Sequence, residues 1–182
     1  MKKVKLLIIT LFLLFLVLPI SVSAFAVKND DSVFVGSGET IEGNLYAAGN
    51  TISIDGRVTG DVICAGQTIN INGQVDGDVI CAGQTINING PIGGSVRVGG
   101  NSVNINSAVA RNVQAFGASI NLGTDGTVGW DMLVAGATAE IRGKVGGDLH
   151  GGAANVVIFG EIAKNVRLKL DDRVKKETKG IV

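Results

Sequence analysis

The sequence predicts an all-β protein, a three-sided parallel β-helix (β-solenoid) made of seven to eight coils of about 17 residues. The string GDVICAGQTINING occurs twice, starting at Gly60 and again at Gly77. Apolar residues recur at fixed positions in the neighbouring segments and alternate with polar ones, as in strands. Glycine recurs at three positions of each repeat, which indicates three corners and therefore three faces.

Residues 1–24 have the features of a secretory signal peptide. Three lysines precede an apolar run from Leu6 to Ile20, and small residues before Ala24 suit cleavage after that position. The run is shorter than the ~20 apolar residues of a membrane-spanning helix, which favours a cleaved signal. The alternative is an uncleaved membrane anchor through residues 6–22. Both interpretations place the body outside the cytoplasm, in the periplasm, at the cell surface or in the extracellular space.

Three further segments follow the signal. Residues 25–42 lead into the repeats, with part of a first coil from Ser32. Residues 43–168 form the β-helix, in which the segment 111–129 is two residues longer than the other repeats. Residues 169–182 are highly charged and are expected to form a tail beyond the last coil.

The repeat predicts which side chains are buried. Counted from Gly43, the third, fifth, tenth, twelfth and sixteenth positions of each coil are apolar, so they should point inward and stack into one core. The best-preserved members of these columns are Val62, Val79, Ile69, Ile86, Ile71, Ile88, Val75 and Ile92.

Glycines should form the corners between the faces. We expect them to supply the positive φ angles that sharp bends require. In the two best-preserved coils these corner glycines are Gly60, Gly66, Gly73, Gly77, Gly83 and Gly90.

Two cysteines, Cys64 and Cys81, occupy the same inward position in consecutive coils. Their spacing matches neither a zinc site nor a Cys-x-x-Cys redox motif. Elsewhere the column holds Ala, Val and Gly, which favours small, unbonded core side chains. A disulfide between Cys64 and Cys81 is the alternative, since stacked coils bring the Cα atoms close enough and an exported protein meets oxidising conditions.

The polar side chains at outward positions do not form a pattern typical of a catalytic or metal-binding site. The only histidine, His150, falls at an outward position, and we interpret it as a surface side chain. Aspartates recur at the second position of several coils, where Asn and Ser also occur. This favours side chains that bind backbone donors at the corner over a calcium or lyase site. We therefore predict no enzymatic activity, no catalytic residues, no metal and no cofactor.

A Thr-x-Asn-x-Asn face repeats outward through Thr68, Asn70 and Asn72 and their counterparts one coil later. We favour a solvated face with asparagine ladders between coils. The alternative is a binding module that uses this flat face to hold a glycan or ice. Nucleic acid is not an expected partner, because the body of the chain is acidic.

Exposed apolar side chains are the candidate assembly surface. Tyr46, Ile63 and Ile80 share one outward column, and Trp130 stands where other coils have a corner glycine. Lateral association or membrane contact would use these side chains. Stacking of end coils would use the other three candidates, Ile41, Val166 and Leu168.

The spacing Gly-Asp-Val … Gly … Ile-x-Ile-x-Gly-x-Val, repeated in register over about residues 41–163, resembles the bactofilins, a family of polymer-forming bacterial cytoskeletal proteins. The resemblance implies a right-handed β-helix and end-to-end polymerisation without a nucleotide. Bactofilins are typically cytoplasmic, and this chain departs from them by its export signal. The expected function is a non-enzymatic scaffold that self-assembles into filaments or oligomers outside the cytoplasm, with itself and the cell envelope or membrane as partners.

Overall fold

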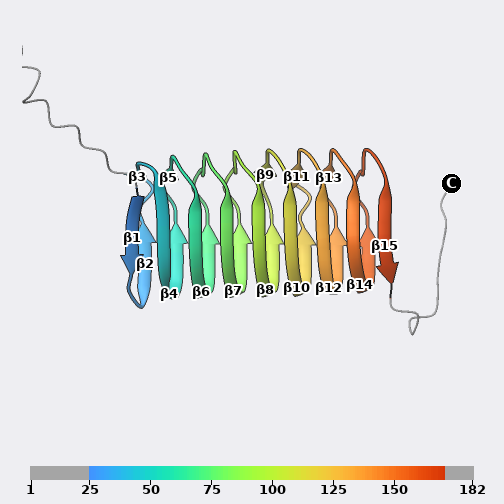
Figure 1. Ribbon diagram of the computed structural model, residues 1–182, viewed down its shortest axis with the longest axis horizontal. Coiled ribbons are helices and arrows are strands. Elements are labelled where there is room, and N and C mark those ends of the chain that lie inside the picture. Colours follow the sequence, from blue (N-terminus) through green and yellow to red (C-terminus); the bar gives the residue numbers. More distant parts are fainter. Residues whose placement is uncertain (1–24, 171–182) are drawn as a thin grey trace, which may run out of the picture.

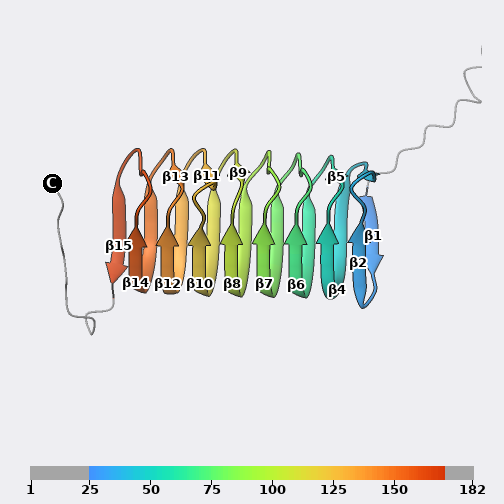
Figure 2. The ribbon, with the colours of Figure 1, turned by 180° about the vertical axis from the view of Figure 1, so that it is seen from behind.

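The computed structural model describes residues 25–170, and this part of the chain is a prism of stacked β-coils with no helix. The parallel strands repeat about every 17 residues through about eight turns, so the predicted β-solenoid is confirmed. Figures 1 and 2 show the coils side by side along the long axis, with the first and last coils at opposite ends.

In most coils one long strand covers two faces, and a short strand or a single bridge covers the third. Their bounds are β1 Phe25–Asn29, β2 Ser32–Val35, β3 Thr40–Ile41, β4 Asn44–Ile54, β5 Arg57–Val58, β6 Val62–Ile71, β7 Val79–Ile88, β8 Val96–Ile105, β9 Ala108–Val109, β10 Val113–Leu122, β11 Thr127–Val128, β12 Met132–Ile141, β13 Lys144–Val145, β14 Leu149–Ile158 and β15 Val166–Leu170.

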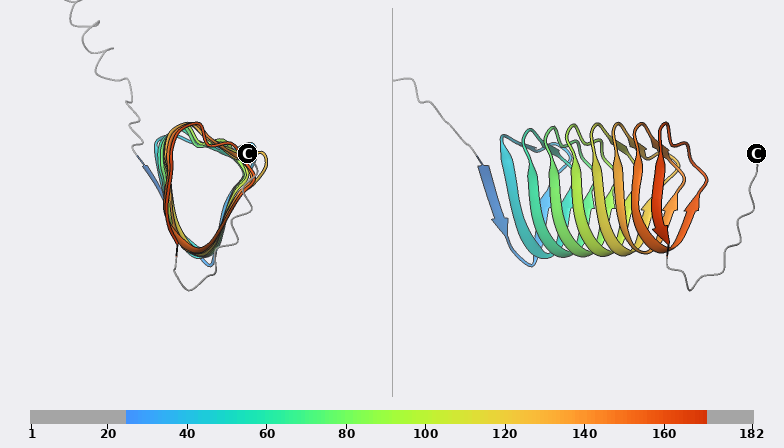
Figure 3. Two further views of the ribbon diagram at one scale, coloured as in Figure 1. Left: turned by 90° about the vertical axis from the view of Figure 1, so that its right-hand side faces the viewer. Right: turned by 45° about the vertical axis from the view of Figure 1, so that its right-hand side comes forward.

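Each coil has three faces, visible end-on in Figure 3. The first half of a long strand, such as Val62–Ala65 of β6, forms face one. Its second half, Thr68–Ile71, forms face two after a bend near Gly66. Face three is made of the short strands and of single bridges such as Val75 with Ile92.

The coils pair in register, which places equivalent side chains on top of one another. Val62 pairs with Val79, and Ile69 pairs with Ile86. Side chains alternate along each face, so the third and fifth positions point inward on face one, and the tenth and twelfth positions point inward on face two, after the bend near Gly66. The eight predicted core residues are at most 1% exposed, and the cluster that contains them continues through the stack.

Two coils are longer than 17 residues, and both place the extra residues at the same corner. Val113 of β10 pairs with Met132, and Ser32 of β2 pairs with Thr51, each 19 residues further on. Between faces two and three the backbone closes a turn, in which Glu39 N–H donates to the Gly36 carbonyl. Gly126 N–H donates to the Gly123 carbonyl in the same way, so this corner accommodates the additional length.

The N-terminal coil is more complete than the sequence predicted. Instead of starting at Ser32, it starts with β1, which pairs with the first half of β4 from Phe25 onward. β2 pairs with the second half of β4, and β3 pairs with β5 on face three. The prediction missed β1 because Lys28 occupies an inward position that is apolar or small in the following coils.

The corner glycines do not have the conformation we predicted. Among the described residues only Gly43 and Gly151 have positive φ, at 82° and 143°. The six predicted corner glycines instead lie against the coil before them. A Cβ atom on Gly66 would stand 2.6 Å from the Gly49 carbonyl oxygen, and one on Gly83 would stand 2.5 Å from the Gly66 oxygen. Close approach of backbones, not left-handed geometry, accounts for glycine here.

Candidate assembly surfaces

The C-terminal end of the prism is apolar and open along one face. Among the strands of residues 25–170, β15 pairs only with the first half of β14, from Leu149 to Ala153, and none follows the second half of β14. Ile158, at an inward position, is therefore 37% exposed, although its counterpart Ile141 one coil earlier is fully buried. Phe159 at the next corner is 70% exposed.

The two predicted C-terminal assembly residues lie at this same end. Val166 in β15 is 47% exposed, and Leu168 is half-buried against the core. Val156 and Ile162 in the preceding coil are also only partly buried. Together with Ile158 these partly exposed apolar side chains make up what we call the C-terminal end surface.

The third end-coil candidate, Ile41, lies at the opposite end and is buried. It belongs to the N-terminal coil, and its exposed fraction is 9%. Val33 and Val35 of the same coil are buried as well. The sequence grouped Ile41 with Val166 and Leu168 as one kind of end-coil residue, whereas the two ends of the prism differ in structure.

An ion pair lies across the N-terminal end. The Lys28 ammonium is 2.9 Å from Glu39 Oε1 and also donates to the Phe34 carbonyl at 3.1 Å. Gly36 N–H donates to the second carboxylate oxygen of Glu39 at 3.2 Å. The hydrogen bond from Lys28, more than the one from Gly36, lowers the pKa of the Glu39 carboxyl. The Glu39 carboxyl is therefore ionised at neutral pH.

The outward column with Tyr46, Ile63 and Ile80 lies on face one, and Val27 extends it into the N-terminal coil. Tyr46 and Ile80 are exposed and Ile63 is half-buried. Between this column and Ala48 and Ala65 there is a shallow, mostly apolar hollow. The column ends at Arg97, which follows Ile80 in register and forms an ion pair with Asp78 at 2.8 Å.

Trp130 is not part of that column. It lies three coils beyond Ile80, at the corner before β12, and is exposed. The Arg111 guanidinium stacks over its indole ring, 5.9 Å from the centroid. The structure therefore separates the predicted outer candidates into an apolar column near the N-terminal end and a single aromatic residue farther along.

Asparagines on face two form the ladders that the sequence favoured. The Asn87 side-chain amide donates to Asn70 at 2.8 Å, and Asn104 donates to Asn87 at 2.9 Å. A parallel ladder at the next corner connects Asn89 to Asn72 and Asn106 to Asn89. These amides bind one another along the prism axis, which leaves fewer of their donors for an external ligand.

Aspartates at the second position bind the backbone of the next coil. Asp61 Oδ1 accepts from Asp78 N–H, and Asp78 Oδ1 accepts from Ser95 N–H, both at 2.8 Å. The Ser95 bond and then the Arg97 side-chain bond lower the pKa of Asp78. Asp131 and Asp148 are connected in the same way. This is the corner chemistry predicted for the column, with the donor supplied by the following coil.

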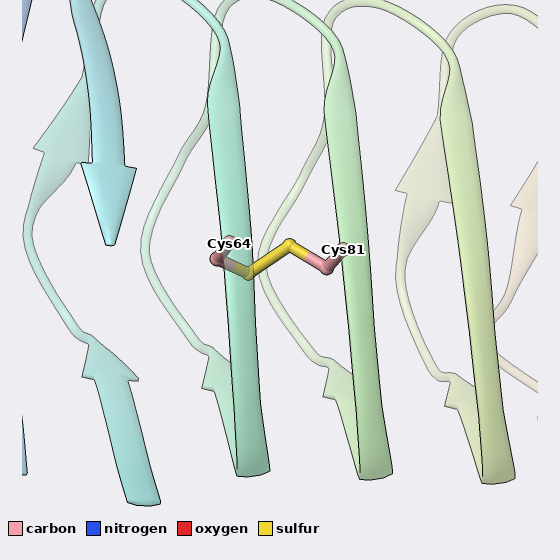
Figure 4. The surroundings of a disulfide bond; sticks show 2 residues. All are labelled: Cys64 and Cys81. Atoms are coloured by element: carbon pink, nitrogen blue, oxygen red, sulfur yellow. A yellow bond between two sulfur atoms is a disulfide. The ribbon is translucent and has the colours of Figure 1, made fainter. Parts of the chain in front are cut away.

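Cys64 and Cys81 form a disulfide, so the prediction that favoured unbonded thiols is wrong. Their Cα atoms are 4.6 Å apart, and Figure 4 shows the bond linking β6 and β7. Both residues are about 5% exposed on the inner side of face one. In-register stacking of Cys64 on Cys81 brings the two side chains within bonding distance.

His150 lies on face one with its Nε2 atom 3.4 Å from Asp148 Oδ2. That carboxylate already accepts the backbone N–H and the side-chain amide of Asn165, the two bonds that most lower the pKa of Asp148. Within residues 25–170 no group of three His, Cys, Asp or Glu side chains is arranged to hold a metal ion.

No protein-family model matches the chain, and no curated protein or solved structure matches it. Over the range that the structure describes, no helix is long and apolar enough to cross a membrane.

Proposed function

We propose that this protein is an exported, non-enzymatic scaffold of the bactofilin type, which self-assembles by stacking an end coil on another copy of itself. A β-solenoid is compatible with a structural or binding scaffold. The observation that carries self-assembly is the C-terminal end surface, where Ile158 and Val166 are exposed at the end of an otherwise closed core. Stacking a second coil there would bury apolar area and pair a free strand edge.

The polar groups of the outer faces support a structural role over a catalytic one. The aspartate column binds backbone N–H groups of neighbouring coils, and the asparagine columns bind each other. Acid–base catalysis needs a proton donor or acceptor within reach of a bound substrate, with its pKa near the working pH. The Asp78 and Asp148 carboxyls have lowered pKa values instead, because they accept hydrogen bonds that hold the coils together.

Export is supported by two independent features. The N-terminal 24 residues carry the signal pattern, and the Cys64–Cys81 disulfide is of a kind that persists in oxidising compartments. Cell fractionation with N-terminal sequencing tests this part of the proposal. A mature chain that starts near Phe25 outside the cytoplasm is the expected result, and a cytoplasmic full-length chain would contradict it.

Self-assembly is tested by light scattering and negative-stain electron microscopy. Both use the chain in the form that remains after processing in the cell. We expect a species larger than the monomer whose population rises with protein concentration. Val166→Asp places a charge on the C-terminal end surface and should reduce assembly at least tenfold in apparent affinity. His150→Ala on a lateral face is the matched control and should leave assembly unchanged. A monomer at every concentration and salt would contradict the proposal.

The alternative function, a binding module for glycan or ice, rests on the hydroxyl column of face two. Thr51, Thr68, Thr85 and Ser102 pair in register and form a flat, evenly spaced row. A Thr68→Val/Thr85→Val variant should lose binding in glycan-pulldown or ice-recrystallisation assays if this row is a site. Asn87→Ala and Asn89→Ala variants test the adjoining ladders, and unchanged binding in both sets would remove face two as a binding surface.

A further inference from the structure

The two ends of the prism contain the same inward columns but expose them differently. At the tenth and twelfth positions the N-terminal coil holds Val33 and Val35, which are 3% and 0% exposed. The corresponding residues of the last full coil are Val156, which is half-buried, and Ile158, which is 37% exposed. Within residues 25–170 an end coil has no neighbouring strand on its outer side, so equal exposure would be expected at both ends unless one end were covered.

Lys28 covers the N-terminal end. It pairs in register with Ala47, an inward position of face one, where the other coils hold apolar residues or glycine. Its ammonium reaches the Phe34 carbonyl on face two and Glu39 at the corner beyond, so the side chain spans the end of the core. Glu39 is held in place by Gly36 N–H in the extended corner turn.

This arrangement makes the possible end contacts unequal. Stacking a coil on the N-terminal end would bury the Lys28–Glu39 pair, and removing two charges from water opposes association. This cost arises once when a C-terminal end stacks on an N-terminal end. It arises twice when two N-terminal ends stack on each other. A contact between two C-terminal end surfaces buries apolar side chains such as Ile158 and Val166 against each other.

Building on the self-assembly proposed above, we infer that the Lys28–Glu39 pair closes the N-terminal end, so that assembly stops at a symmetric pair of chains joined through their C-terminal end surfaces. The two chains are related by a two-fold axis at this contact, so they run around the shared prism axis in opposite directions. The strands of the two last coils therefore meet antiparallel. Closed symmetry explains why growth stops, since the pair presents only N-terminal ends to further copies.

By composition, a second copy suits the C-terminal end surface better than residues 171–182 do. Seven of the twelve residues 171–182 are charged, and only Val174, Ile181 and Val182 are large and apolar. A segment of this composition has little apolar surface with which to replace water over Ile158 and Val166. A second copy offers an apolar surface of the same shape.

The test compares the assembly size of the processed full chain with that of variants at the N-terminal end. We expect the wild type to be dimeric by light scattering, with particles about 80 Å long, twice the ~40 Å of eight coils spaced ~4.8 Å apart. Lys28→Met/Glu39→Gln removes both charges and should yield assemblies larger than dimers. Lys28→Gln/Glu39→Gln provides a second neutral version in case the first does not fold.

Two double variants serve as controls for the position of the ion pair and for its charges. Lys28→Glu/Glu39→Lys restores opposite charges and should remain dimeric. Arg57→Met/Asp76→Asn removes a lateral ion pair of similar length and should also remain dimeric. The inference is overturned if the wild type forms filaments, a result that leaves self-assembly intact. It is also overturned if both neutral variants fold and stay dimeric.

Two further outcomes separate this inference from the proposed function. A wild type that is monomeric under all conditions contradicts self-assembly itself. A full chain that is monomeric but dimerises once residues 171–182 are deleted identifies the tail as the cover of the C-terminal end surface, and it overturns the symmetric pair.

Discussion

At several glycines a Cβ atom would meet carbonyl groups of the coil before, because the two backbones lie close together there. Gly83 lies in the middle of β7, directly over the Gly66 carbonyl, and Gly66 lies over Gly49 in the same manner. A Cβ atom on Gly66 or Gly83 would meet a backbone oxygen of the coil before it, so glycine fits the spacing of these coils. The same column holds Ala153 in β14, one coil after Gly136.

Gly83→Ala should destabilise the fold by about 2 kcal/mol, because the new methyl group would stand 2.5 Å from the Gly66 oxygen and the coils must shift to admit it. Chemical denaturation followed by circular dichroism measures the effect. Gly99→Ala is the matched control: a Cβ atom there meets nothing within 4 Å, and the free energy of unfolding should change by less than about 0.5 kcal/mol. Equal losses in both variants would contradict the close-approach explanation.

The Cys64–Cys81 disulfide fastens two neighbouring coils across a sequence separation of 17 residues. Cross-linking a loop of about this size restricts the unfolded chain and is worth about 3 kcal/mol in the chain-entropy account. Cys64→Ala/Cys81→Ala should lower the free energy of unfolding by that amount, with little loss of packing, since alanine occupies the same column at Ala47 and Ala115. Reducing agent should shift the wild type equally and leave the variant unaffected.

At the scale of the strands, ladders of polar side chains join one coil to the next. The Asp78 carboxylate accepts from Ser95 N–H at 2.8 Å and from Arg97 at 2.8 Å, bonds that lower its pKa. A carboxyl whose pKa is depressed by folding stabilises the protein above its unfolded pKa of about 3.9. That contribution is lost as the pH falls through the lower, folded pKa.

We therefore expect the melting temperature of the wild type to decrease below about pH 4. Asp78→Asn retains a side-chain carbonyl that can accept from Ser95 N–H, as Asn44 does from Asp61, but it cannot be protonated. It should be less stable than the wild type at pH 7, and the difference should shrink by pH 2.5. A difference that stays constant across this range would argue against ionisation of Asp78 as its source.

The periodic part of the strands was predictable from the sequence, and the exceptions were not. Inward columns such as Ile69 over Ile86 follow from strand alternation and a fixed repeat, which need no knowledge of the remaining chain. β1 was missed because Lys28 breaks the apolar column, and a charged inward residue makes sense only once its partner Glu39 is known. The disulfide was misjudged because its formation depends on side-chain torsions that a repeat pattern does not specify.

At the scale of the whole molecule the prism is nearly one-dimensional, so each coil is supported only by its neighbours. The C-terminal coil has an incomplete neighbour, whereas the N-terminal coil is tied by an ion pair and a buried core. The candidate assembly residues were recognised in the sequence as apolar, but their division between two unlike ends could not be. That division depends on which coil is last in the stack and on which side chains lie across the core at that end.

Hydrogen exchange should reveal this difference between the ends. In a monomeric Val166→Asp variant, backbone amides of Ser32–Val35 should exchange at least tenfold more slowly than those of Val156–Ile158, because local opening is easier where the core is exposed. In the assembled wild type the C-terminal amides should gain protection and the N-terminal ones should not change. Equal protection at both ends of the variant would contradict the asymmetry.

The corner that hosts the two longer coils has a consequence for engineering. Gly36 and Gly123 begin turns that absorb two extra residues while β4 and β12 keep their pairing on either side. A peptide grafted between Gly123 and Gly126 would project sideways from the shaft without disturbing the columns inside it. This edge of the prism can thus carry an inserted peptide, while the C-terminal end surface stays available for joining a second copy.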